Sequence, residues 1–167
     1  MSFDTPITRA GETLTGPLRS PAQMLAEQEY AGHTSVHDDE TAAELGLAGA
    51  PIEGPTHFSQ IDPLAVEHWG QQWFETGCVS AHFLNMVVEG DEVRAALEPT
   101  AASSARISAE KADGTPVLTG TASVGRDATT ELDERRRRGL EDPGTLHIVD
   151  QLELGMTELI DEPVTMG

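Results

Sequence analysis

Residues 36–54 read VHDDETAAELGLAGAPIEG and contain the clearest local signals of the chain. Asp38 or Asp39 is placed to cap a helix over residues 40–45, because a carboxylate there accepts hydrogen bonds from the first unpaired helical amides. Gly46 suits the left-handed position that ends such a helix. The stretch therefore predicts a short, well-bounded helix ahead of the next element.

A second helical pattern begins at Gly54-Pro55, since proline is favoured in the first helical turn. Its apolar residues recur at helical spacing and predict a face packed on a core; they are Phe58, Ile61, Ala65, Trp69 and Trp73. Pro63 interrupts this pattern, so we expect either a kink or two short helices, with Asp62 capping the second.

After Cys78 the apolar residues alternate with polar or small ones, which is typical of strands with one buried face. The expected hairpins join residues 78–83 to 93–97 across a turn at 89–91, and residues 106–109 to 117–124 across Asp113-Gly114. Helices followed by antiparallel strands indicate an α+β domain in which one helix lies across a sheet.

The 167 residues suit a single domain. We expect an irregular N-terminal arm over residues 1–24, the folded domain over 25–126, and a polar helix with a C-terminal extension over 127–167.

Charge and composition narrow the classes of partner. The chain has 29 Asp and Glu against 10 Lys and Arg, a net charge of −19, so nucleic acid and anionic membrane surfaces are not expected partners. This acidity is typical of a salt-adapted, halophilic protein, while the preference for Arg over Lys also fits a high-GC bacterial cytosol. Cys78 is the single cysteine, and neither a signal peptide nor a membrane-spanning run is visible, so we expect a cytoplasmic protein.

Three segments together resemble the MaoC-like hydratases: Val36-His37-Asp38-Asp39 with Gly46, Pro51-Ile52-Glu53-Gly54, and Phe83 ahead of Glu89-Gly90-Asp91. These are hot-dog proteins that add water to, or remove it from, the double bond of an acyl thioester. The resemblance covers about residues 25–125. It implies a hot-dog fold, in which an antiparallel sheet wraps around a central helix, assembled as a homodimer or with a second hot-dog subunit.

Reversible hydration of an enoyl thioester needs an acid/base group and donors for the enolate oxygen. The resemblance assigns the first task to His37 and the second to the backbone amide of Gly54 at a helix N-terminus. Because Pro55 has no amide hydrogen, we expect the amides of Thr56 and His57 to be the other donors available to the substrate. The implied substrates are enoyl-CoA or (3R)-hydroxyacyl-CoA thioesters; coenzyme A is then part of the substrate, and no separate cofactor or metal is expected.

The chain departs from the family five residues before His37, where the family has its aspartate and this chain has Gly32. A shift of one residue would place His33 at that position and pair it with His37. The other candidates for this second group are Asp38, Glu53 and His57.

Two other functions stay open. A hot-dog thioesterase would use the same helix N-terminus to stabilise a tetrahedral oxyanion and would activate water with Glu53 or Asp62. A non-catalytic acyl-binding or partner subunit is favoured by the missing aspartate. Release of free thiol from acyl-CoA would identify the thioesterase, and a copurifying catalytic partner would identify the subunit.

Overall fold

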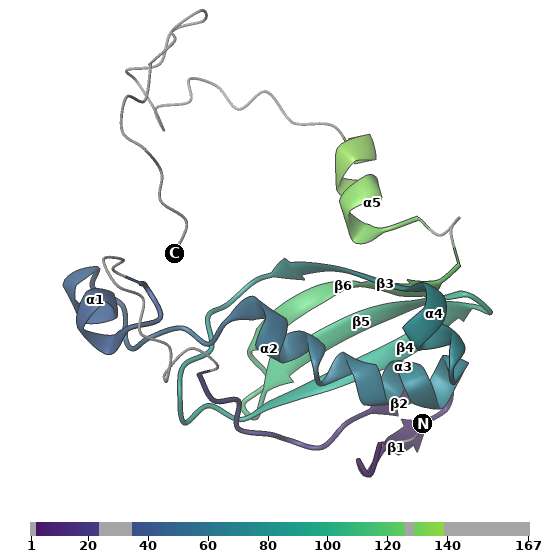
Figure 1. The fold of residues 1–167 in the computed structure, drawn as a ribbon, viewed down its shortest axis with the longest axis horizontal. Coiled ribbons are helices and arrows are strands. Elements are labelled where there is room, and N and C mark those ends of the chain that lie inside the picture. Colours follow the sequence, from purple (N-terminus) through teal and green to yellow (C-terminus); the bar gives the residue numbers. More distant parts are fainter. Residues whose placement is uncertain (1–2, 24–34, 126–128, 139–167) are drawn as a thin grey trace, which may run out of the picture.

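The computed structural model describes residues 3–23, 35–125 and 129–138. Its strands are β1 (Thr8–Ala10), β2 (Thr13–Thr15), β3 (Gly77–Phe83), β4 (Val93–Ala101), β5 (Ser104–Lys111) and β6 (Pro116–Val124). Its helices are α1 (Asp39–Glu44), α2 (Gly54–Phe58), α3 (Ile61–Trp69), α4 (Gln72–Thr76) and α5 (Glu131–Arg138). The strands form one antiparallel sheet in the order β1-β2-β4-β5-β6-β3, as Figure 1 shows.

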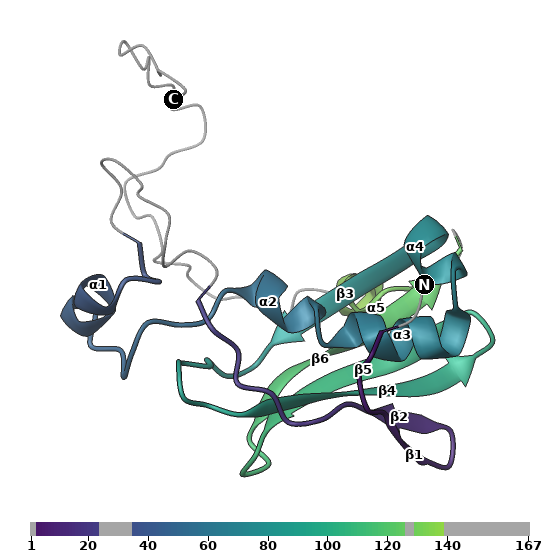
Figure 2. The same cartoon turned by 60° about the horizontal axis from the view of Figure 1, so that its bottom comes forward.

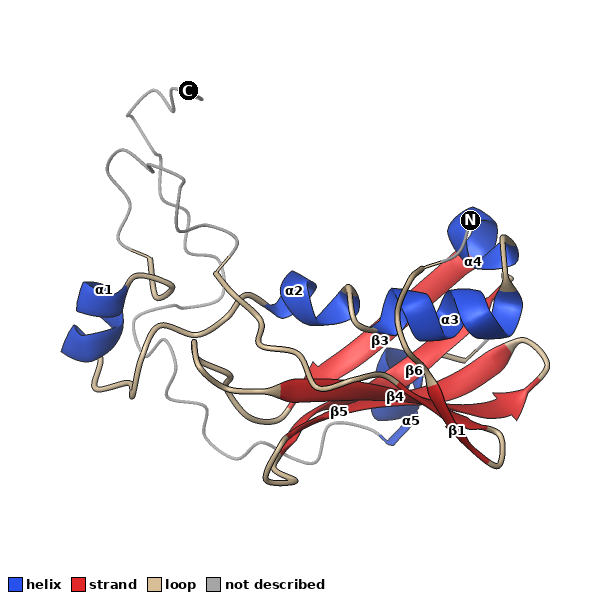
Figure 3. Ribbon diagram, turned by 90° about the horizontal axis from the view of Figure 1, so that it is seen from below, coloured by secondary structure: helices blue, strands red, loops and turns tan. Residues whose placement is uncertain are grey.

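Helix α3 lies across one face of this sheet, and α5 lies on the opposite face (Figure 3). The core is the layer between α3 and the sheet, where Leu64 of α3 joins Leu97, Ile107 and Leu118 of three successive neighbouring strands. Burial of such side chains is the main source of stability in a domain of this size. An antiparallel sheet wrapped around a central helix is the hot-dog fold, and this prediction is confirmed.

The predicted hairpin between residues 78–83 and 93–97 is wrong. Strand β3 pairs with β6 at one edge, from Gly77 opposite Val124 to Phe83 opposite Leu118, so that two strands separate it from β4. The backbone between β3 and β4 is engaged elsewhere, because the Ile52 amide donates to the Val87 carbonyl at 2.7 Å. Alternation of apolar residues predicts that a segment is a strand, but it leaves open which strand it pairs with.

The second predicted hairpin is confirmed as β5 and β6. Gly114 supplies the positive φ of 87° in its turn. Such a backbone conformation favours glycine, which explains why the Asp-Gly dipeptide was informative.

The irregular arm predicted at the N-terminus is wrong over residues 8–15. Strands β1 and β2 form a hairpin that extends the sheet beyond β4, with Leu14 opposite Leu97 (Figure 2). Leu14 is fully buried, so its side chain, together with the pairing of β2 with β4, attaches the hairpin to the core. Where the folded domain begins along the sequence stays a prediction.

The helix signals are confirmed except for one cap and the position of one break. The Asp38 carboxylate accepts from the amides of Glu40 at 2.9 Å and Thr41 at 3.1 Å, and Gly46 follows α1 with a φ of 74°. The helical path divides into α2 and α3 as predicted, but the break lies at Ser59 and Gln60 and not at Pro63, which the first turn of α3 accommodates. Asp62 does not cap α3, because it lies inside the first turn and accepts a hydrogen bond from the Trp73 indole at 2.9 Å.

Candidate functional site

His37 is held in one orientation by the backbone of the loop that leads to α2. Its Nδ1 lies 2.6 Å from the Pro51 carbonyl oxygen. A carbonyl can only accept, so the proton of the neutral ring is on Nδ1 and Nε2 keeps its lone pair. The Ser35 hydroxyl accepts from the His37 amide at 3.2 Å and holds the backbone as well. The half-buried imidazole is therefore oriented as a base through Nε2.

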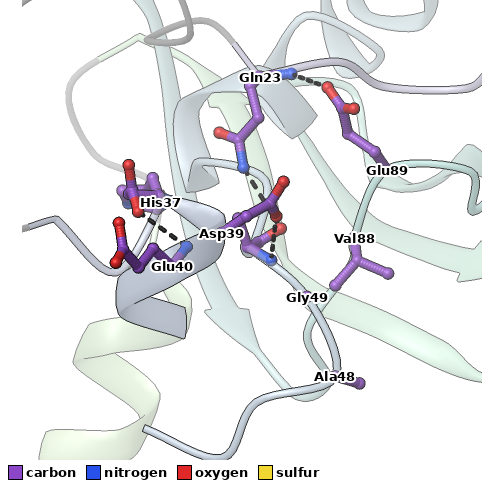
Figure 4. Close-up of a pocket in the computed structure, with 10 residues that line it drawn as sticks. Gln23, His37, Asp39, Glu40, Ala48, Gly49, Val88 and Glu89 are labelled. Carbon is purple, nitrogen blue, oxygen red and sulfur yellow. Dashed lines mark hydrogen bonds between the residues drawn. The ribbon is translucent and has the colours of Figure 1, made fainter. Parts of the chain in front are cut away.

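The pocket beside His37 has a volume of about 560 Å³ and an acidic lining, drawn in Figure 4. Its carboxylates are Asp38, Asp39, Glu40 and Glu89. Gln23 extends across it, with its amide nitrogen 2.9 Å from the Pro51 carbonyl and its backbone amide 3.4 Å from Glu89. Such a lining disfavours phosphate or carboxylate groups and is compatible with water.

Gly54 and His57 lie in a second pocket, of about 470 Å³, at the start of α2. Most of its lining is apolar; the residues are Pro51, Ile52, Gly54, His57, Phe83, Leu84, Asn85, Met86 and Val87. We expected the Thr56 amide to be available to a ligand. It is not, because it donates to the Glu53 carbonyl at 3.0 Å. The pocket thus combines an apolar wall with the Gly54 end of α2.

Three polar side-chain atoms on this part of the helical path are buried without a hydrogen-bond partner: Thr56 Oγ1, His57 Nδ1 and Gln60 Oε1. Residues three and four apart share a helix face, so these atoms belong to one side of the path. His57 is only 3% exposed, and burial lowers the pKa of its imidazole. The ring is therefore neutral at neutral pH.

The two pockets are neighbours, and Pro51 lies between them. Pro51 accepts the hydrogen bond from His37 and also lines the apolar pocket, and Val87 and Val88 line one pocket each. The structure therefore brings Gly54 and His57 together and places His37 on the other side of the Pro51 backbone.

The remaining candidates have different positions. Glu53 is buried next to Gly54. Asp62 is engaged by Trp73 at the α3–α4 junction. His33 and Gly32 lie outside the described residues, so the second catalytic group stays a prediction.

The Pro51 carbonyl, which orients His37, was not predicted from the sequence. Every residue has a carbonyl, so no residue type could have identified this one. Gln23, which lies 14 residues before His37 and contacts the same carbonyl, was not predicted either.

Within residues 3–23, 35–125 and 129–138, no three His, Cys, Asp or Glu side chains are grouped so that they could hold a metal ion. None of the helices placed in these ranges is long and apolar enough to cross a bilayer.

The curved sheet and its central helix make this chain a hot-dog protein. No family model and no curated protein matches the sequence. Among solved structures, an (R)-hydratase from A. caviae involved in PHA biosynthesis is similar, with 18% identity over 71% of this chain and 98% of that one, and a TM-score of 0.46. R-hydratase PhaJ1 from Pseudomonas aeruginosa shares 16% identity over 96% and 94% of the two chains, with a TM-score of 0.47. A monoamine oxidase regulatory protein from Archaeoglobus fulgius shares 17% over 73% and 93%, with a TM-score of 0.43.

Proposed function

We propose that this chain is a hydratase or dehydratase of enoyl-CoA or (3R)-hydroxyacyl-CoA thioesters, as its resemblance to the MaoC-like family implies. The observation that carries the proposal is the 2.6 Å hydrogen bond from His37 Nδ1 to the Pro51 carbonyl. It leaves Nε2 free of the ring proton, as a general base requires. The motif histidine is thus in the tautomer that the chemistry needs.

In this proposal the two pockets have separate tasks. The apolar pocket holds the acyl group, and water is activated by His37 from the polar side. His37 Nε2 takes a proton from water as the oxygen bonds to the β-carbon, and the electron pair of the double bond moves toward the thioester oxygen. The Gly54 end of α2 stabilises the resulting enolate oxygen through its amide and the local helix dipole. The thioester carbonyl then re-forms as the α-carbon takes up the proton that His37 Nε2 had accepted, which returns His37 to its starting form.

We propose that a second hot-dog unit completes the assembly. Within the described strands, β3 pairs only with β6 and so leaves one edge unpaired. The exposed side chains of Leu84 and Met86 continue beyond this edge. An unpaired edge beside exposed apolar side chains favours a protein partner, either a second copy or a related subunit.

A thioesterase is the second candidate, and one observation favours it. Glu53 precedes Gly54 and is buried, and in a thioesterase it would be the carboxylate that activates water against a thioester carbonyl bound at the start of α2. Asp62 does not support this candidate, because its carboxylate accepts a hydrogen bond from the Trp73 indole.

The test is incubation of the purified protein with crotonyl-CoA and with a longer enoyl-CoA, at low and at molar salt. Loss of the conjugated thioester absorbance without thiol release is the expected result. Thiol release would instead indicate the thioesterase, and the absence of both would indicate a binding subunit.

His37→Ala is expected to lower the hydration rate about 10²–10⁴-fold with an unchanged unfolding transition. His82→Ala is the matched control, because His82 lies on β3 and lines neither pocket next to Pro51. A His37→Ala variant that keeps full activity would contradict the proposed role.

A further inference from the structure

The Phe83 ring lies directly against the start of α2. A Cβ added at Gly54 would be 3.0 Å from Cζ and 3.2 Å from Cε2 of this ring. Its centroid is 6.2 Å from that of His57 and 6.1 Å from that of Phe58. The missing side chain at Gly54 thus leaves the space that the phenyl ring occupies.

The backbone of Phe83 is fixed, whereas its side chain is half in solvent. Phe83 is the last residue of β3 and pairs with Leu118, and the next amide, that of Leu84, donates to the Val117 carbonyl at 2.8 Å. Yet 44% of Phe83 is exposed, and the ring lines the apolar pocket together with Gly54 and His57. A ring that only filled the core would be buried on both faces.

Phe83 therefore separates two environments. One side of the ring covers the residues of α2 that the proposed function places nearest the thioester, and the rest forms a wall of a pocket of about 470 Å³. That volume is within the range of small-molecule sites, so removal of one phenyl ring changes a substantial part of the available space.

We infer that Phe83 is the residue that selects the acyl group, by serving as the wall against which the chain of a thioester substrate packs. This inference rests on the proposed function and assigns its specificity to one side chain. Phe83→Ala enlarges the pocket next to Gly54 and shifts the preference toward long or branched acyl chains. Phe83→Trp fills the pocket and shifts the preference toward short chains.

The experiment measures binding and turnover as a function of chain length. Dissociation constants for butyryl-CoA and dodecanoyl-CoA, which lack the reactive double bond, are determined by calorimetry. The values of kcat/KM for crotonyl-CoA and trans-2-dodecenoyl-CoA are determined in parallel. In Phe83→Ala, the ratio of long-chain to short-chain values is expected to rise about tenfold or more in both measurements, which is the scale of discrimination in apolar pockets. In Phe83→Trp the ratio is expected to fall.

Phe74→Ala is the matched control, because Phe74 is 48% exposed, lies on α4 and lines neither this pocket nor the one beside His37. Its ratio is expected to equal that of the wild type. Phe83→Leu retains an apolar side chain and gives an intermediate ratio, which keeps the test valid if the alanine variant does not fold.

Two contrary results are distinguishable. If the wild type binds and hydrates both chains but the ratio is the same in Phe83→Ala and Phe74→Ala, the inference is overturned and the proposed function stands. If the wild type neither binds nor converts any acyl-CoA, the proposed function is overturned, and the inference with it.

Discussion

The two ends of the helical layer are built differently. At the aromatic end, formed by Asp62, Trp69 and Trp73, the two indole rings stack with centroids 5.8 Å apart and an interplanar angle of 15°. Trp69 donates to the Ala102 carbonyl and Trp73 to the Asp62 carboxylate, each at 2.9 Å. Both indole N–H groups there have a hydrogen-bond partner and Trp73 is buried, although Nε2 of His68, whose ring packs against Trp69, is buried without a partner.

The pocket end, formed by Gly54, His57 and Phe83, has both an unpaired polar atom and an exposed apolar ring. The His57 Nδ1 is buried without a partner, and Phe83 leaves almost half of its surface in solvent. A buried polar atom without a partner costs about 1–3 kcal/mol, so this arrangement is not explained by stability. An unpartnered imidazole nitrogen occurs at both ends, so the difference lies in the apolar side chains: Trp73 is buried against the core, whereas the half-exposed Phe83 lines a pocket that a ligand can enter.

The largest effect is expected at the aromatic end. Trp73→Ala removes a side chain that is 7% exposed and leaves a cavity between α4 and the sheet, so the free energy of unfolding should fall by about 3–5 kcal/mol. Urea unfolding measures this loss. The neighbouring Phe74→Ala, on the exposed side of α4, should change stability by less than about 1 kcal/mol. Equal losses in the two variants would contradict the assignment of stability to the indole cluster.

Substitutions at two glycines, one at each end, test how rigidly the neighbouring aromatic side chain is held. A Cβ at Gly77 would overlap the Trp73 carbonyl oxygen and lie 2.7 Å from Trp73 Cε3, so Gly77→Ala should cost about 1–3 kcal/mol. A Cβ at Gly54 meets the half-exposed Phe83 ring, which can move, so Gly54→Ala should change stability by less than about 1 kcal/mol. Thermal unfolding of both variants measures this difference. A Gly54→Ala variant that is destabilised as strongly as Gly77→Ala would show that the Phe83 ring is rigidly fixed.

The sequence predicted those features that depend on local chemistry. Asp38 and Gly46 bound α1, and Gly114 forms its turn, because caps and left-handed positions require particular residue types. The pairing of β3 with β6 could not be predicted, since alternation is the same whichever strand lies alongside. The strands β1 and β2, of three residues each, are too short for a clear periodic signal.

The same distinction between local features and features of the folded chain holds for the candidate site. The histidine and glycine of the motif were found from residue type and spacing. The contact of His37 with the Pro51 carbonyl, and the placement of His37 and Gly54 in separate pockets, arise only from the folded backbone.

The smallest expected effect is a pH dependence of stability that originates at the pocket end. Burial lowers the pKa of His57 below its ordinary value of 6.5. Between this value and the lowered pKa, the unfolded chain binds a proton at His57 that the folded chain does not bind. The contribution of His57 to stability is therefore complete above pH 6.5 and decreases as the pH falls below it, with a slope of at most about 1.4 kcal/mol per pH unit.

His57→Gln isolates this contribution, because glutamine does not titrate and can still form hydrogen bonds. The free energies of unfolding of wild type and variant are compared from pH 8 down to pH 5, above the range in which most carboxylates bind protons. The wild type should lose stability relative to His57→Gln only below about pH 6.5, and the difference should be constant above it. A constant difference over the whole range would mean that the buried imidazole is as readily protonated as one in water. That result would remove the neutral His57 from the description of the pocket end.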